Sequence, residues 1–185
     1  GAWSWGGAPV PCARRGGGAF GRGVRARAAA AGATPAYAPR LDVAVIASTA
    51  GHVHAAGVFT TNQVIAAPCL ITRQHLAKGH LRGVVVNSGN ANACTGPQGE
   101  RDAVAMATAG AELLHVDPHE LGVASTGVIG VPLPMARIAP AISRTTPTES
   151  GWGDVARATM PTHPRPQVAQ DAGRPARFRH TDDWH

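Results

Sequence analysis

Hydrophobic positions in the middle of the chain follow two spacings, one typical of strands and one typical of helices. Residues 41–48 (LDVAVIAS) are dominated by β-branched and other apolar residues, which predicts a buried strand. Residues 81–87 (LRGVVVN) form a continuous apolar run, consistent with a strand buried on both faces. Residues 121–125 (LGVAS) are predicted to form another short strand that ends at a Thr-Gly pair.

Two further segments are interpreted as extended. Residues 57–61 (GVFTT) are predicted to form a strand, joined to the strand at 41–48 as a hairpin through the turn at 50–56. Residues 67–72 (APCLIT) are predicted to be extended, followed by a short helix that ends at Gly79.

Helical spacing of apolar and small residues is clearest over 100–115, where alanines favour close packing against a sheet. Asp117, which precedes a proline and has Glu120 three residues on, predicts a capped helical turn. Two more helices are predicted at 132–143 and 151–159. Because strands and helices alternate, the predicted class is α/β or α+β.

The composition is typical of a soluble globular protein with one principal domain, since the chain has 185 residues of which 44% are apolar. No run of about eighteen apolar residues occurs, so a membrane span is not predicted. The formal charge of +6 comes from the ends of the chain, because residues 42–164 carry seven basic and eight acidic side chains. A nucleic-acid partner is not expected, because phosphate binding needs basic residues clustered on a folded face.

Residues 1–40 differ from the rest in being built mainly of Gly, Ala, Arg and Pro with little apolar periodicity. Such a segment cannot bury enough surface to offset its ordering entropy, so we expect it to be disordered, or a non-native product of GC-rich coding. An Arg-rich, acid-free start is also typical of an organellar transit segment. The expected organisation is this segment, one partial domain over 41–167, and an irregular tail over 168–185.

The cysteines and histidines give little indication of a disulfide framework or a metal site. Cys12, Cys69 and Cys94 are an odd number without CxxC spacing, which favours a reducing, cytoplasmic compartment. His52 and His54 would face the same side of a strand, but no third ligand of suitable spacing is near. We therefore predict no bound metal and no bound cofactor.

The stretch after the 81–87 strand is unusually polar and places Asn87, Asn90 and Asn92 among Ser, Thr and Gly residues. Asn accommodates left-handed backbone, and Gly allows a ligand or another segment to approach closely. The residues alone fit two interpretations equally: an active-site or binding loop, and a polar turn that satisfies its own backbone. A phosphate-binding loop is disfavoured because the GxxxxGK[ST] spacing is missing.

Three segments in order carry a resemblance to a known family: AAGVFTTNQV at 55–64, VVVNSGNANACTGPQG at 84–99 and VASTGVIGVPLP at 123–134. They resemble signatures of the ornithine acetyltransferase (glutamate N-acetyltransferase) family of arginine biosynthesis. The resemblance covers roughly residues 41–167. It implies a layered sheet-and-helix sandwich similar to that of N-terminal nucleophile hydrolases, of which this chain holds the N-terminal (alpha-chain) part.

The same resemblance implies roles for particular residues. In the family, Thr and Gly of the STGVIG segment form the oxyanion hole of acyl transfer, which assigns that role to Thr126 and Gly127. Thr162 lies in a segment similar to a substrate-binding motif, although neighbouring motif positions differ. The family's nucleophile is a Thr that heads a second (beta) subunit after the precursor cleaves itself, and no matching motif occurs in this chain.

The leading hypothesis is therefore an enzyme that transfers acetyl from N-acetylornithine to glutamate through an acetyl-threonine intermediate, with acetyl-CoA as an optional donor. The isolated chain is expected to be inactive, because it lacks the nucleophile. Two alternatives stay open, namely a truncated remnant without activity and a small anion-binding module that uses the Asn-rich stretch. The expected partners are the two amino-acid substrates and the second subunit, with no nucleic acid and no membrane.

Overall fold

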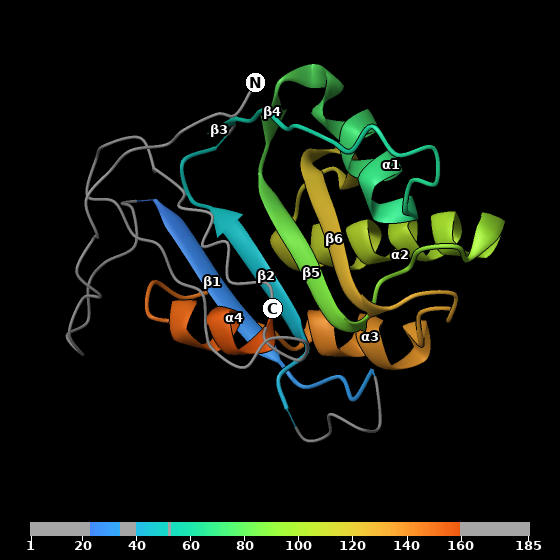
Figure 1. The fold of residues 1–185 in the computed structure, drawn as a ribbon. Coiled ribbons are helices and arrows are strands. Elements are labelled where there is room, and N and C mark those ends of the chain that lie inside the picture. Colours follow the sequence, from blue (N-terminus) through green and yellow to red (C-terminus); the bar gives the residue numbers. More distant parts are fainter. Residues whose placement is uncertain (1–22, 34–39, 52, 160–185) are drawn as a thin grey trace, which may run out of the picture.

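The computed structural model describes residues 23–33, 40–51 and 53–159, which form a sheet with helices on both faces (Figure 1). Four strands make up the main sheet, in the order β1-β2-β5-β6. Their bounds are β1 Val24–Ala29, β2 Val43–Ser48, β5 Gly83–Asn90 and β6 Leu121–Val128. β1, β2 and β5 are antiparallel neighbours, whereas β5 and β6 run parallel. β6 is thus an edge strand.

A helical crossover joins β5 to β6, as a parallel pair requires. The crossover helix is α2, Gly96–Leu114, and it packs on the sheet together with α3, Met135–Ser143. Gly110 of α2 lies so close to the sheet that a Cβ there would be 2.4 Å from Val85 Cγ2. The centre of this main core consists of fully buried residues: Val43, Val45, Val85, Met106, Leu121 and Ile138.

The opposite face of the sheet is covered only in part. Figure 1 shows α4, Trp152–Ala158, in front of the sheet near β1 and β2, with α2 and α3 behind it. A smaller core lies under α4, where Val155 and Ala158 pack against alanines of β1 and β2. On β6, Ala124 and Thr126 lie on this same face because side chains alternate along a strand; Ala124 is exposed and Thr126 is half-buried.

The first half of the outer edge of β6 is closed by a helix, α1 (Ala67–His75), instead of another strand. The Thr72 hydroxyl donates to the Val123 carbonyl (2.7 Å) and accepts from the Val123 N–H (2.8 Å). One turn later, His75 Nδ1 donates to the Leu121 carbonyl (2.6 Å). These side chains satisfy peptide groups that an edge strand otherwise leaves open to pairing with another chain.

The prediction of an extended segment at 67–72 is wrong, because these residues begin α1. Pro68 lies in the first turn, where its missing N–H costs nothing. Burial of Ile71 and the contact of Thr72 with β6 then favour the helix. The predicted helix end is confirmed, since a 3₁₀ turn (η2, Leu76–Lys78) stops at Gly79 with a φ of 72°.

The predicted hairpin is also wrong, since residues 57–61 form no strand. The strand in this region is β3, Val53–His54, which pairs with β4, His80–Leu81. Val58 is fully exposed, so the apolar residues of GVFTT do not mark the inner face of a strand.

β1 corrects the expectation that residues 1–40 are disordered, for the part of them that the structure describes. Ala26 and Ala28 are buried under α4, while Arg25 and Arg27, which alternate with them, are exposed. This alternation is a strand signal, although the Arg-rich composition masks it. Residues 1–22 and the predicted tail at 168–185 lie outside the described residues.

The other predicted elements are confirmed with shifted ends. α2 begins at Gly96 instead of residue 100, because Pro97 suits a first helical turn. β5 and β6 continue to Asn90 and Val128, so most candidate site residues lie on strand ends and not in loops. In the described ranges, none of the helices has the length and apolar character needed to span a bilayer.

The turn that leads into β6, η3 (Pro118–Glu120), has the predicted cap. The Asp117 carboxylate accepts from the His119 N–H (2.8 Å), and the Glu120 carboxylate accepts from the Asp117 N–H (3.2 Å). The backbone hydrogen bond from His119, aided by the His119 side chain, holds the pKa of Asp117 below its ordinary value of 3.8.

We predict that Thr72→Val destabilises the fold by about 1–3 kcal/mol, because the peptide group of Val123 loses both of its partners on the edge side. Urea unfolding measures the loss. The matched control is Thr108→Val on the exposed face of α2, where the hydroxyl bonds only to the Val104 carbonyl of its own helix. Equal losses in the two variants would contradict the edge-closing role of Thr72.

We predict that Asp117→Ala lowers the melting temperature near neutral pH and that the loss shrinks in acid. Because the folded-state pKa is depressed, ionised Asp117 contributes stability above the ordinary pKa, and this contribution disappears as pH falls through the folded value. Thermal melts from about pH 7 to about pH 2 test this. Glu149→Ala, which removes an exposed acid outside the cap, is the control. A loss that does not change with pH would contradict the prediction.

Candidate active site

The carboxyl ends of β5 and β6 bring two of the predicted site segments together. In the parallel register, Ser88 pairs with Thr126 and Gly89 pairs with Gly127. The Asn-rich stretch and the Ser-Thr-Gly stretch are far apart in sequence, yet they form neighbouring strand ends. Figure 1 shows this end of β5 (green) and β6 (gold) beside each other, on the side of the sheet where α3 lies.

Gly127 packs directly against the backbone of β5. A Cβ at Gly127 would lie 2.3 Å from the carbonyl carbon and oxygen of Gly89 and 2.7 Å from the nitrogen of Asn90. The φ angles of Gly127 (133°) and Gly89 (108°) lie in the range that favours glycine. Both space and backbone conformation therefore require glycine at position 127.

The peptide N–H of Gly127 points to the outer edge of the sheet. Leu121 and Val123 direct their peptide groups to this edge, where α1 binds them. Every second residue of a strand faces the same neighbour, so Gly127 faces the edge as well. Val128 faces β5, since its carbonyl accepts from the Ala91 N–H (2.9 Å). In the described residues, hydrogen bonds from α1 to β6 reach only as far as Val123, so the Gly127 donor lies at the open part of the edge.

Thr126 supplies a second potential donor beside this N–H. Its side chain lies on the face of β6 that α4 leaves uncovered, and it is half-buried. Acyl transfer develops negative charge on a carbonyl oxygen, and preorganised donors stabilise that charge. The hydroxyl of Thr126 and the N–H of Gly127 can therefore form an oxyanion hole at the end of β6.

The three candidate asparagines turn inward and are buried. Each donates from Nδ2 to a backbone carbonyl: Asn87 to Asn90 (3.1 Å), Asn90 to Pro132 (3.5 Å) and Asn92 to Gly99 (2.8 Å). Of the two interpretations of this stretch, the geometry favours polar side chains that satisfy backbone groups. It gives no support to an anion-binding module built from these amides.

The remaining candidates do not join this site. Thr162 and His52 lie outside the described residues. Within the described ranges, no group of three His, Cys, Asp or Glu side chains is arranged to hold a metal.

A network of buried hydrogen bonds holds the end of β5, and the sequence does not predict it. Ser88 donates from its N–H to the Asp42 carbonyl (2.8 Å) and from its hydroxyl to the Ala158 carbonyl at the end of α4. The Asp42 carboxylate accepts from the N–H groups of Ala31 (2.5 Å) and Ala33 (2.7 Å). β5 is thereby tied to the loop after β1 and to α4. No local pattern signals these contacts, because they join segments distant in sequence.

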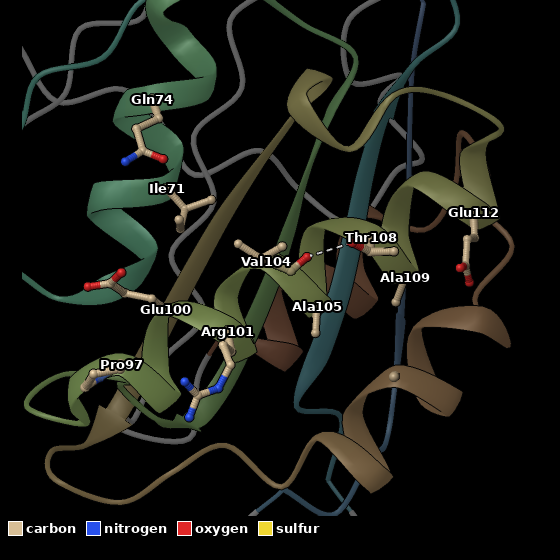
Figure 2. Close-up of a pocket in the computed structure, with 11 residues that line it drawn as sticks. Ile71, Gln74, Pro97, Glu100, Arg101, Val104, Ala105, Thr108, Ala109 and Glu112 are labelled. Carbon is tan, nitrogen blue, oxygen red and sulfur yellow. Dashed lines mark hydrogen bonds between the residues drawn. The ribbon is translucent and has the colours of Figure 1, made fainter.

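A separate open groove lies between α1 and α2 and has a volume of about 800 Å³. Figure 2 shows Ile71 and Gln74 of α1 on one side and Val104 and Thr108 of α2 on the other. Neither residue of the proposed oxyanion hole lines it. The groove and the candidate active site are therefore different places.

Sequence comparisons identify similar proteins. The ArgJ family model matches residues 25–175. The arginine biosynthesis bifunctional protein ArgJ of Symbiobacterium thermophilum is 52% identical over 134 residues, which are 71% of this chain and 33% of that protein. The ArgJ protein of Syntrophotalea carbinolica is 45% identical over 134 residues, 69% of this chain and 33% of that protein. The chain thus spans about a third of the length of these curated relatives.

Solved structures are similar over most of the chain. The crystal structure of ArgJ from Bacillus halodurans has a TM-score of 0.73 at 37% identity, covering 78% of this chain and 75% of that chain. Ornithine acetyltransferase from Mycobacterium tuberculosis, complexed with ornithine, has a TM-score of 0.74 at 40% identity, covering 78% of each chain. These likenesses confirm the predicted layered sheet-and-helix class, which is that of the N-terminal nucleophile fold.

We predict that Gly127→Ala destabilises the protein by about 2–6 kcal/mol, since backbone strain and overlap with β5 each cost about 1–3 kcal/mol. The matched control is Gly130→Ala. Gly130 also has a positive φ (79°), but no neighbouring heavy atom lies within 4 Å of its Cβ position. It should lose only about 1–2 kcal/mol of unfolding free energy in urea. Equal losses would show that the Gly89–Asn90 peptide does not restrict position 127.

Proposed function

The chain belongs to the ArgJ family of arginine-biosynthesis acyltransferases, and from this premise we propose that it supplies the oxyanion hole for acetyl transfer from N-acetylornithine to glutamate. The observation that carries the proposal is the end of β6, where position 127 requires glycine. There the Gly127 N–H faces an open strand edge, next to the hydroxyl-bearing Thr126. Two donors at a rigid strand end suit an oxyanion.

In the proposed reaction, the hydroxyl of a threonine that heads a second subunit attacks the acetyl carbonyl of N-acetylornithine. The free amine of that threonine takes up the hydroxyl proton. As the new C–O bond forms, the carbonyl oxygen becomes negative, and Gly127 and Thr126 donate hydrogen bonds to it. Collapse of this intermediate breaks the amide C–N bond and returns the proton to the leaving ornithine. Acetyl-threonine remains, and the amine of glutamate attacks it through the same steps.

The substrates in this proposal rest on two kinds of observation, a solved structure of a relative and the family resemblance. The ornithine acetyltransferase of Mycobacterium tuberculosis was solved with ornithine, which supports an ornithine-type substrate for its relatives. Glutamate as acceptor and acetyl-CoA as an optional donor come from the family resemblance. Thr162 stays a proposed substrate contact on the same ground.

The second (beta) subunit is proposed to cover the open edge of β6. Three apolar side chains follow Gly127 and are strongly exposed: Val128 (49%), Ile129 (64%) and Val131 (44%). Apolar residues clustered beside a proposed site are typical of a surface that another chain covers. A partner bound there would bring its threonine close to the Gly127 and Thr126 donors.

An acetyl-transfer assay separates this proposal from an inactive remnant. The chain alone is expected to be inactive, and the chain reconstituted with a second subunit that carries the nucleophile is expected to transfer acetyl. Activity of the isolated chain would contradict the location of the nucleophile. Inactivity after reconstitution with a folded second subunit would favour the remnant.

We predict that Thr126→Ala in the reconstituted enzyme lowers kcat on the order of a hundredfold, since loss of one oxyanion donor has about this effect. KM for N-acetylornithine should change by less than about twofold, because the donor acts on charge that develops only in the transition state. Thr146→Ala, at an exposed position away from β6, is the control. Unchanged turnover in Thr126→Ala would remove its proposed role.

A further inference from the structure

We propose that Asn87 is a positioning residue for the turn that carries the Gly127 donor. Asn87 itself is fully buried and touches no substrate in this proposal. Its effect on turnover rests on the proposed function, whereas its effect on the conformation of the turn does not.

A chain of contacts links Asn87 to Gly127. Asn87 Nδ2 donates to the Asn90 carbonyl (3.1 Å), a buried hydrogen bond across three residues. This bond holds Asn90 in place at the end of β5. The nitrogen of Asn90 lies 2.7 Å from the position that a Cβ of Gly127 would occupy. Asn90 is therefore held on two sides, at its carbonyl by the Asn87 amide and at its nitrogen by the backbone of Gly127.

Asn87 is not the residue that would make the core most stable. Its Oδ1 is buried and has no hydrogen-bond partner among the described residues. The side chain lies on the same face of β5 as Val85, two residues earlier, which packs in the main core. Ser125 is its neighbour in the register, but the Ser125 hydroxyl lies 4.0 Å from Met106 Sδ and gives no bond to Oδ1. A buried acceptor without a partner destabilises a fold, so the Nδ2 bond is what favours an amide here.

The variant Asn87→Leu separates positioning from stability. Leucine has a similar size, removes the orphaned Oδ1 and adds apolar contact in the core. The Asn90 carbonyl, however, loses the Asn87 amide as a donor, so Asn90 is held less firmly at the end of β5. Because the nitrogen of Asn90 packs against Gly127, a loosened Asn90 loosens the contact between the two strand ends. We therefore expect unchanged or higher stability together with a looser turn, the reverse of what a purely structural residue shows.

Amide hydrogen exchange on this chain tests the turn directly. In Asn87→Leu, the amides of Ala91, which donates to the Val128 carbonyl, and Val128, which faces β5, should exchange at least about tenfold faster than in the wild type. The melting temperature should fall by no more than about 2 °C. The matched control is Thr145→Val, which also removes a buried bond to a carbonyl three residues away (Ile142, 2.8 Å) but lies at the end of α3. It should melt lower and leave these two amides unchanged.

Kinetics of the reconstituted enzyme test the consequence. Asn87→Leu should lower kcat by about tenfold to a hundredfold with KM for N-acetylornithine within about twofold, because only the oxyanion donor is misplaced. Unchanged exchange at Ala91 and Val128 overturns the proposal. Faster exchange with unchanged kcat, in an enzyme whose wild type is active, also overturns it. If the wild type transfers no acetyl, the proposed function fails, while the exchange result still decides the role of Asn87 in the turn.

A second variant keeps the shape of the side chain, and its lost hydrogen bond should return in acid. Asn87→Asp keeps the shape of the side chain, but an ionised carboxylate cannot donate to the Asn90 carbonyl. When the carboxyl is protonated in acid, its O–H can donate again. The difference in Val128 exchange between Asn87→Asp and the wild type, compared at the same pH, should therefore shrink as pH falls. A difference that stays constant would contradict positioning through this hydrogen bond.

Discussion

The packing of Gly127 against the Gly89–Asn90 peptide is the contact on which the candidate site depends. Because no side chain intervenes, backbone atoms alone set the separation of the two strand ends. Backbone contacts of this kind leave little room for adjustment, since protein interiors are packed to near-crystalline density. The buried polar residues of β5 maintain the contact from behind. Ser88 ties the strand to the Asp42 backbone, and Asn87 holds the carbonyl of Asn90.

The position of β6 at the edge of the sheet explains how one strand can serve both the core and the site. Its first half contributes Leu121 and Val123 to the main core, and α1 binds the peptide groups of these residues at the edge. Its second half passes beyond these hydrogen bonds. An open edge is normally a liability because it pairs with other chains. In the proposed function, the same openness would present the Gly127 N–H to a substrate.

The spacing of apolar and polar residues predicts the elements of this fold that form through short-range interactions. The strand at Val43–Ser48 and the helix at Gly96–Leu114 follow from β-branched runs and helical spacing, and the cap at Asp117 follows from residue chemistry. At α1, tertiary contacts decide the structure, because a short apolar run does not distinguish a strand from a helix. Pro68, which suits the first turn of a helix, is the sequence feature that favours the helix. The roles of Thr126 and Gly127 follow from family resemblance, and no single-sequence rule reveals that Gly127 packs against the Gly89–Asn90 backbone.

The arrangement also explains why the proposed site needs a partner. Hydrogen-bond donors stabilise a developing charge far better in a dry site than in water, because water screens the charge and competes for the donors. In this chain Gly127 and Thr126 are only half-buried, and apolar residues exposed next to them lie beyond the end of β6. A second subunit seated on those apolar residues would exclude water from the two donors. Binding of the second subunit would then cover the edge and supply the nucleophile at the same time. The proposed oxyanion hole would reach its full strength only when the nucleophilic threonine is present.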